Sequence, residues 1–327
     1  MSESLIVASS PHIRAELSTQ KIMGLVLLAL LPAGAAGVCF LGVRSLAVIA
    51  VCVIACEASE AIWQKCAGQP VTVSDLSAAV TGLLLAYNLP PSIPLWMAAV
   101  GGVFSMIIVK QFFGGLGQNV VNPALAGRAM MLICWPVHMT TWTVQGVSGP
   151  TALAVIKEAE KAAPGISGAS ASLGEEVASS GLPTLMDALL GRMGGCIGET
   201  SALALIAGGV FLIAAGIISW RIPAVYIATV AVLSVAFGRS AGPVEILYGG
   251  LMLGAFFMAT DYTTSPITPK GQAVFAVGCG ILTSLIRAFG GYPEGVSFSI
   301  LIMNFVVPII DGATSPRVFG EVKKIGA

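Results

Sequence analysis

Long apolar runs, interrupted by short polar breaks, fill most of the chain. About 20 apolar residues in a helix cross a bilayer core of about 30 Å, and fewer suffice where a helix is broken or re-entrant. Ten runs fit this description: 22–43, 45–63, 75–90, 94–112, 119–136, 200–219, 222–237, 243–261, 271–289 and 297–311. The pattern predicts an all-α, polytopic membrane protein of about ten transmembrane helices.

The one long polar segment lies between the fifth and sixth runs. It divides the chain into five predicted parts: a cytoplasmic N-terminal segment at 1–21, a first membrane repeat at 22–136, an outer loop at 137–199, a second membrane repeat at 200–311 and a cytoplasmic tail at 312–327.

The two membrane parts resemble each other weakly. In residues 79–128 and again in 250–305, a helix ends in a polar break and the next helix ends in Gly-Gly. The breaks are at Asn88 and Asp261. Because the copies are offset by five helices, an odd number, the second copy is upside down. The sequence therefore predicts two inverted five-helix repeats with broken or re-entrant helices, as in channels and transporters.

Composition narrows the class of protein further. Of 327 residues, 56% are hydrophobic and only 10% are charged, whereas soluble proteins carry about 25% charged residues. The 16 Lys and Arg residues balance the 16 Asp and Glu residues, so net charge indicates no nucleic-acid partner. The seven cysteines form no C-x-x-C or Cys/His spacing, so no metal site is predicted.

Lys and Arg residues of the short loops predict the orientation. With both termini in the cytoplasm, the short outer loops hold only Arg44, Arg239 and Arg287. The cytoplasmic side then holds Arg14, Lys21, Lys65, Lys110, Arg221, Lys270, Arg317, Lys323 and Lys324. We therefore expect both termini inside and the long loop on the outer face.

Three asparagines within the apolar runs are candidate binding residues. Asn119 and Asn122 precede Pro123 at a helix start, where free backbone N–H groups and the helix dipole favour an anionic or carbonyl-bearing ligand. Asn304, followed by Pro308 within a helix, is the matching candidate in the second half. A polar group inside the membrane usually faces the bundle interior.

A short polar run in the long loop is open to two interpretations. Its sequence is VSGPTAL, with Ser148, Gly149, Pro150 and Thr151 at its centre. It is either a simple turn or the point of attachment of a redox cofactor.

Four segments carry a family resemblance that covers essentially the whole chain. They read GGLGQNVVNPALAGRA at 114–129, ATDYTTSPITPKGQ at 259–272, YPEGVSFSILIMN at 292–304 and VPIIDGATSPRVFG at 307–320. They resemble the D subunit of the Rnf electron-transport complex, a family related to the B subunit of the sodium-translocating NADH:quinone reductase. The length is closer to the Rnf protein, because its relative carries a longer N-terminal extension.

The resemblance implies a flavoprotein subunit of a redox-driven ion pump. Such a complex passes electrons between ferredoxin and NAD and moves sodium ions or protons across a bacterial or archaeal cytoplasmic membrane. The implied partners are the other Rnf subunits, both membrane and soluble iron-sulfur or flavin subunits. No G-x-G-x-x-G loop follows a strand, so we expect NAD to bind to a partner.

The resemblance also implies a covalent flavin. In this family a flavin transferase joins FMN through its phosphate to the threonine of a Ser-Gly-Ala-Thr type motif, which here corresponds to Ser148, Gly149 and Thr151. This sequence departs from the motif in having Pro150 in place of Ala, and the upstream acidic residue is missing from 144–147. Thr314, in a Gly-Ala-Thr pattern, is a competing site on the predicted cytoplasmic side, whereas the transferase works on the outer face. We therefore assign Thr151.

Further sites follow from the same resemblance. Relatives hold a second, non-covalent flavin, riboflavin or FMN, within the helix bundle, and Asn119, Asn122 and Asn304 are its candidate contacts. Carboxylates within the predicted spans cost about 2.5 to 3.5 kcal/mol on insertion scales. The candidates for the ion path are Glu57, Glu60 and Asp261.

Three alternatives stay open. The chain is a component like the B subunit of the sodium-translocating quinone reductase, a plain solute channel or transporter built on the repeat, or a scaffold that assembles a complex without redox chemistry. A colourless purified protein with unmodified Thr151 would indicate the channel, and tight assembly without flavin would indicate the scaffold.

Overall fold

The chain is helical in the computed structural model. It describes residues 17–144, 147–149, 151–162, 185–191, 194–239, 242–292 and 294–316. The class predicted from the sequence, an all-α polytopic membrane protein, is confirmed. One two-stranded antiparallel hairpin, which the hydrophobic pattern did not predict, lies in the polar segment.

The first half of the molecule holds the elements up to the polar segment. They are α1 (Thr19–Leu41), α2 (Arg44–Cys66), η1 (Val73–Asp75), α3 (Ser77–Tyr87), α4 (Leu95–Phe104), η2 (Ser105–Lys110), η3 (Gln111–Phe113), α5 (Pro123–Cys134) and α6 (Pro136–Met139).

The polar segment contributes β1 (Trp142–Val144), β2 (Val147–Gly149), α7 (Ala152–Ala162), α9 (Leu185–Leu190) and η4 (Ile197–Glu199). The second half follows with α10 (Ala202–Ala214), α11 (Arg221–Ala236), η5 (Gly242–Leu247), α12 (Leu251–Leu253), η6 (Gly254–Met258), α13 (Pro269–Phe289) and α14 (Val296–Thr314).

Among the described residues, five helical segments are long and apolar enough to cross a membrane. They are Thr19–Leu41, Arg44–Cys66, Leu95–Phe113, Pro269–Phe289 and Val296–Thr314, and four shorter apolar helices accompany them. The predicted run 243–261 folds as short pieces, η5, α12 and η6, rather than as one helix. Gly249, with φ of 68°, lies at this break and adopts a backbone conformation that L side chains rarely take.

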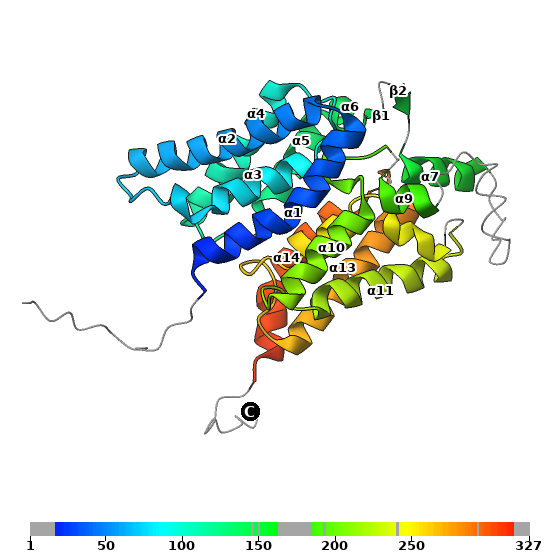
Figure 1. The fold of residues 1–327 in the computed structure, drawn as a ribbon. Coiled ribbons are helices and arrows are strands. Elements are labelled where there is room, and N and C mark those ends of the chain that lie inside the picture. Colours follow the sequence, from blue (N-terminus) through cyan, green and yellow to red (C-terminus); the bar gives the residue numbers. More distant parts are fainter. Residues whose placement is uncertain are drawn as a thin grey trace, which may run out of the picture.

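The packing repeats with the predicted five-helix offset. In the first half α2 packs on α3 and α4, and in the second half α11 packs on η5 and α13. Figure 1 shows α1 to α5 as one group and α10 to α14 as another beside it, with α1 against α10 between them. A Cβ on Gly208 of α10 would lie 2.3 Å from the Ala29 carbonyl oxygen of α1, so this contact depends on a glycine.

Candidate functional site

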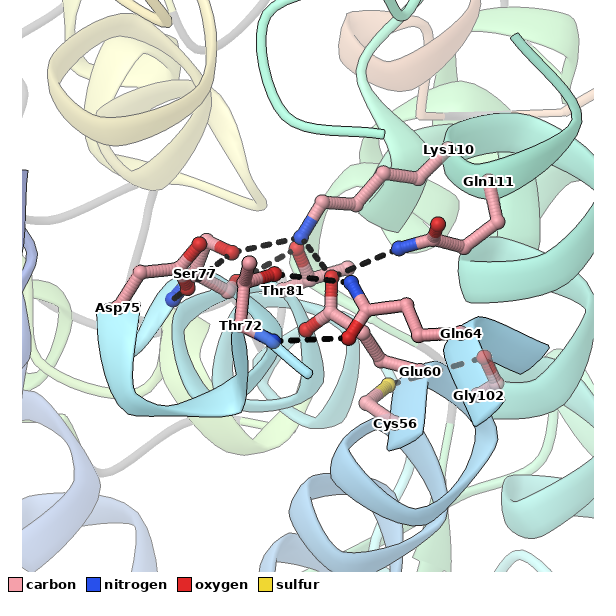
Figure 2. Close-up of polar contacts among 10 residues, drawn as sticks. All are labelled: Cys56, Glu60, Gln64, Thr72, Asp75, Ser77, Thr81, Gly102, Lys110 and Gln111. Carbon is pink, nitrogen blue, oxygen red and sulfur yellow. Dashed lines mark hydrogen bonds and ion pairs between the residues drawn. The ribbon is translucent and has the colours of Figure 1, made fainter. Parts of the chain in front are cut away.

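A buried ion pair joins α2 to the end of the fourth helix (Figure 2). Lys110 Nζ donates to Glu60 Oε1 at 2.8 Å and to Ser77 Oγ at 2.6 Å. Gln111 Nε2 donates to the same Glu60 oxygen at 2.8 Å. The side chains of Glu60 and Lys110 are 1% and 3% exposed. Because an isolated charge is costly in apolar surroundings, each of the two charges stabilises the other.

Local backbone irregularities position the members of this network. Lys110 ends the π-helix η2 and precedes the 3₁₀ turn η3. The wide turns of π-helices are frequent at functional sites. At the start of α3, Asp75 accepts hydrogen bonds from the backbone N–H and the hydroxyl of Ser77, at 2.8 and 2.6 Å. Leu76, between them, has a positive φ of 64°. Together these turns direct Lys110 and Ser77 toward Glu60 (Figure 2).

The structure distinguishes two carboxylates that the sequence treated alike. Glu60 is buried and paired, whereas Glu57 is half-buried and has no ion-pair partner in the described part of the chain. The sequence placed Lys110 among the loop cations, and this placement is wrong because the side chain is buried against Glu60. The signal in the sequence that indicates burial of Lys110 is its position at the end of an apolar run.

A second buried network holds two arginines that the sequence placed in outer loops. Arg239 Nε donates to Glu245 Oε2 at 2.7 Å, and Arg287 Nη1 donates to the Glu245 carbonyl oxygen at 3.1 Å. Arg287 also donates to the Tyr248 carbonyl oxygen at 3.1 Å, and its side chain is 1% exposed. Arg287 lies in the last turn of α13, so its placement in a loop is wrong. Arg239 does lie between α11 and η5, but its side chain is buried against Glu245.

The two networks occupy equivalent places in the two halves. Lys110 ends the fourth helical segment of the first half and Arg287 lies in the last turn of the fourth helix of the second. Each reaches back to the start of the third segment, to Ser77 in the first half and to Glu245 in the second. Each half thus contains a buried cation paired with a carboxylate.

Asn122 and Asn304 meet at the centre, where the two halves join. The Asn122 side chain caps α5 by accepting from the backbone N–H groups of Ala124 and Leu125. With the Asn304 amide oriented so that both of its polar atoms find partners, its oxygen accepts from the Asn122 backbone N–H at 3.1 Å and its NH₂ group donates to the Thr264 carbonyl oxygen at 3.0 Å. These two predicted residues are in direct contact, and both satisfy backbone groups at helix breaks.

A cavity of about 290 Å³ lies beside this contact. Asn119, Asn122 and Asp261 all line it, together with Lys110 and Phe256. Asp261 accepts hydrogen bonds from the hydroxyls of two neighbouring threonines, at 3.0 and 3.1 Å. The structure thus brings together two of the three predicted asparagines with one predicted carboxylate. Asn304 is not among the described residues that line this cavity, and its side chain forms hydrogen bonds with backbone groups instead.

Thr151 lies at the N-terminus of α7 and is buried. Its Oγ1 accepts from the Ala154 backbone N–H at 3.2 Å, the geometry of a helix cap. Its residue exposure is 5%. The preceding strand β2 places Ser148 opposite Thr143 in the hairpin with β1, and Gly149 opposite Trp142. The placement of Pro150 lies outside the described residues.

Thr151 faces a second cavity, of about 180 Å³. Arg128 and Glu294 form an ion pair on its wall, and Arg128 also donates to the Ser297 hydroxyl. Trp142 and Tyr292 complete the lining near Thr151. The arrangement combines a hydroxyl, a helix N-terminus and a guanidinium group, a set that suits a phosphate group.

The competing threonine has no such surroundings among the described residues. Thr314, at the end of α14, shares a hydrogen bond of 2.6 Å with the Thr268 hydroxyl and donates to the Ile310 carbonyl oxygen at 2.8 Å. Thr268 in turn caps α13 through the Gly271 backbone N–H. The Thr314 hydroxyl thus belongs to the packing between α13 and α14.

The helical spans, the paired buried charges and the two cavities define a multi-pass membrane protein of the transporter and translocase kind. The chain belongs to the NQR2, RnfD, RnfE family, whose model matches residues 6–320.

Three relatives illustrate the similarity. The chain is 49% identical over 325 residues to the D subunit of the Na(+)-translocating ferredoxin:NAD(+) oxidoreductase complex of Acetobacterium woodii, covering 98% of this chain and 96% of that protein. It is 46% identical over 326 residues to the D subunit of the proton-translocating ferredoxin:NAD(+) oxidoreductase complex of Clostridium ljungdahlii, covering 96% of both chains. It is 38% identical over 344 residues to the D subunit of the ion-translocating oxidoreductase complex of Halorhodospira halophila, covering 97% and 96%. The resemblance to the Rnf family is confirmed.

Proposed function

We propose that this chain is the flavin-carrying membrane subunit of an ion-translocating ferredoxin:NAD oxidoreductase complex, with FMN joined through its phosphate to Thr151. The observation that carries the proposal is the position of the Thr151 hydroxyl, at the start of α7 in a cavity that Arg128 also lines. When bound, the flavin would supply reversible electron transfer. The relatives named as subunits of such complexes support the assignment.

The residues around Thr151 fit a phosphoester. Its oxygen is a hydroxyl that forms an ester bond with phosphorus, and the N-terminus of α7 favours negative charge there. Arg128 presents a guanidinium, which matches phosphate oxygens in shape and charge. These groups would hold the phosphate, with Arg128 also paired to Glu294.

The size of the cavity indicates how the cofactor would lie. Its volume of about 180 Å³ is below the roughly 300 Å³ at which pockets for whole organic ligands begin. We infer that the phosphate and the sugar-alcohol chain lie inside, with the ring system outside where a partner protein reaches it. Trp142 and Tyr292 offer aromatic surfaces on the cavity wall.

The burial of Thr151 constrains the attachment step. Residues Leu153 and Ile156 of α7 pack with Tyr248 in a small apolar cluster. A flavin transferase needs access to the Thr151 oxygen, so we infer that it acts before α7 packs against Tyr248.

The cavity of about 290 Å³ is our candidate for a second, non-covalent flavin, riboflavin or FMN. Its volume is close to the lower limit for an organic ligand. Asn119, Asp261 and Lys110 are among the polar groups that line it, beside apolar side chains. Asn122 lines the cavity as well, while Asn304 would act by holding Asn122 in place.

The ion path, the orientation and the assembly belong to the same proposal. Glu60 and Asp261 are candidate ion-path residues because Lys110, the partner of Glu60, lines the same cavity as Asp261. Glu57 is a weaker candidate on geometry, since it is half-buried and unpaired among the described residues. The coupling ion is sodium or the proton, as the relatives' names differ on this point.

We further propose that the protein lies in the cytoplasmic membrane of a bacterium or archaeon, with both termini inside. The polar segment 137–199 would lie outside, between the two membrane repeats in the sequence. The partners would be the remaining proteins of the complex and a flavin transferase.

A pair of matched threonine variants tests the covalent flavin. We expect Thr151→Val to fold, since valine has a similar shape, and to abolish the flavin fluorescence of the denatured chain after electrophoresis. Thr314→Val should keep full fluorescence. Peptide mass mapping of the fluorescent band should find the modified peptide at Thr151. Full fluorescence in Thr151→Val would refute the assignment, and a wild-type chain without flavin would favour the solute-transporter alternative.

A further inference from the structure

A buried carboxylate without a partner lies near the junction of the two halves. Glu199, the last residue of η4, is 2% exposed. Within the described residues neither of its carboxylate oxygens has a hydrogen-bond partner. Gly250 packs against it so closely that a Cβ there would lie 2.5 Å from Oε1. An ionised carboxylate in this position is strongly unfavourable unless a positive charge accompanies it.

Two further groups converge on Glu199. The Sγ of Cys196 and one oxygen each of Glu199 and Glu294 lie within 4.8 Å of one another. The Cys196 Sγ lies 3.2 Å from the Asn88 carbonyl oxygen, a contact that a protonated thiol makes as a donor. Burial raises the pKa of this thiol well above its ordinary value, which agrees with a neutral group. Cys196 therefore adds no charge to the cluster.

The remaining charges leave the cluster one positive charge short. Arg128 of α5 pairs with Glu294, and its charge is balanced by that carboxylate. Glu199 then remains as one uncompensated negative charge. A single monovalent cation neutralises it, whereas a divalent ion would leave an excess of positive charge.

The charged groups on the other described elements around η4 are directed to other partners. From α3, the uncharged Tyr87 lies against Gly198. Arg287 lies near Gly249, but its guanidinium donates to the carbonyl oxygens of Glu245 and Tyr248. From α1, the uncharged Gly37 lies against the Ile197 carbonyl oxygen.

We propose that Glu199 and Glu294 form a binding site for one exchangeable monovalent cation, a proton or an alkali-metal ion. The bound cation has a route for exchange, because Glu294 also lines the cavity of about 180 Å³ that Thr151 lines. The side chain of Glu294 is 10% exposed. The site lies outside the residues that were predicted for the ion path. The proposal does not depend on a flavin at Thr151, although Arg128 and Glu294 also line the cavity that would hold the flavin phosphate.

The electrostatics of Glu199 have a consequence for stability. Burial, and then the charge of Glu294, raise the pKa of the Glu199 carboxyl above its ordinary value of 4.5, while Arg128 opposes the shift. A carboxyl with a raised pKa in the folded state contributes most favourably at acid pH. Its contribution falls as the pH rises past the ordinary value, and levels off above the folded-state pKa. An alkali-metal ion that takes the place of the proton would offset this loss.

The test is thermal unfolding of the full-length chain in lipid nanodiscs. The unfolding midpoint of wild type and Glu199→Gln is measured from about pH 5 to about pH 9, in sodium, potassium or choline chloride at equal ionic strength. In choline, the wild-type midpoint should fall with rising pH more steeply than that of Glu199→Gln. A sodium- or potassium-dependent recovery at alkaline pH in wild type alone identifies an alkali-metal ion, and no recovery identifies the proton. Parallel profiles of the two proteins would overturn the proposal.

Two further variants serve as controls. Glu294→Gln lets Arg128 neutralise Glu199, so the extra pH or ion dependence should disappear there too, and this variant substitutes if Glu199→Gln does not fold. If the extra pH or ion dependence persisted in Glu294→Gln, this would count against the site. Cys196→Ser keeps the charge balance and should keep the wild-type profile. Loss of the dependence in Cys196→Ser, with stabilisation of wild type by added Zn²⁺, would instead indicate a thiolate metal site and refute the monovalent cation.

Discussion

Two networks in this protein pair buried side chains of opposite charge, and Glu199 is an exception among the described residues. Glu60 has Lys110 and Gln111 as donors, and Glu245 has two arginines. Each pair loses its hydration on burial, and this cost is recovered only while both members are present. The buried pairs are therefore sensitive to the loss of one member and tolerant of the loss of both.

Lys110→Met tests this at the residue scale. The change leaves the Glu60 carboxylate buried without its cation, and we expect it to lower the free energy of unfolding by about 3 to 5 kcal/mol. The double variant Lys110→Met with Glu60→Gln should recover most of the loss. Unfolding in a detergent titration, followed by circular dichroism, measures both. Lys65→Met, at an exposed lysine of α2, is the control, and a Lys110→Met chain as stable as this control would show that the pair contributes nothing.

Helices in this molecule approach one another through small residues. Gly208 lets α10 pack on the backbone of α1, and Gly82 of α3 packs on α2, where a Cβ would lie 2.7 Å from the Val53 Cα. Membrane helices gain little from hydrophobic burial against each other, so close backbone contact becomes important. The glycines that are important for packing are those at the points where two helices cross, and the number of glycines in a helix does not identify them.

Gly208→Ala tests the crossing at the element scale. The added methyl group meets backbone, which cannot rotate away, so α1 and α10 must separate. We expect a loss of about 1 to 3 kcal/mol, typical of overpacking. Gly312→Ala, in α14 with open space around its Cβ position, is the matched control and should be neutral or slightly stabilising because alanine favours helix. Equal thermal midpoints for the two variants would contradict the assigned crossing.

At the scale of the whole molecule, the buried cations sharpen the argument for orientation. Once the buried, ion-paired Lys110, Arg239 and Arg287 are set aside, Arg44 remains of the cations counted on the predicted outer side, and it is exposed. The exposed cytoplasmic candidates within the described residues are Lys21, Lys65, Arg221 and Lys270. The positive-inside rule counts cations in short loops and near helix ends, and among the exposed ones the asymmetry is larger than the sequence count suggested.

Cysteine labelling in intact cells tests this orientation. In a background without the exposed Cys39, Cys66 and Cys134, Ser170→Cys should react with a membrane-impermeant maleimide, and Lys323→Cys should react only after the cells are opened. Both positions lie outside the described residues, so the expectation rests on the distribution of charge. The reverse pattern would place the polar segment and Thr151 on the cytoplasmic side.

The sequence predicted much of the fold because the signals involved are local. The apolar runs located the helices, and Pro123 with Asn122 located the start of α5, where the asparagine caps the helix. The hairpin of β1 and β2 was missed, since strands of three residues are too short to show an alternating pattern. The motif around Thr151 identified a candidate attachment site by family resemblance alone.

By itself, then, the sequence determined the class of the protein, the approximate positions of its helices and breaks, and its family. Hydrophobic pattern and turn residues act over a few positions, which is the range of a helix turn. Only the tertiary structure decided that Lys110 pairs with Glu60, 50 residues away, and that Asn122 meets Asn304 from the other half. It also decided that Glu199 is left with its charge uncompensated, because pairing and burial depend on how distant helices pack together.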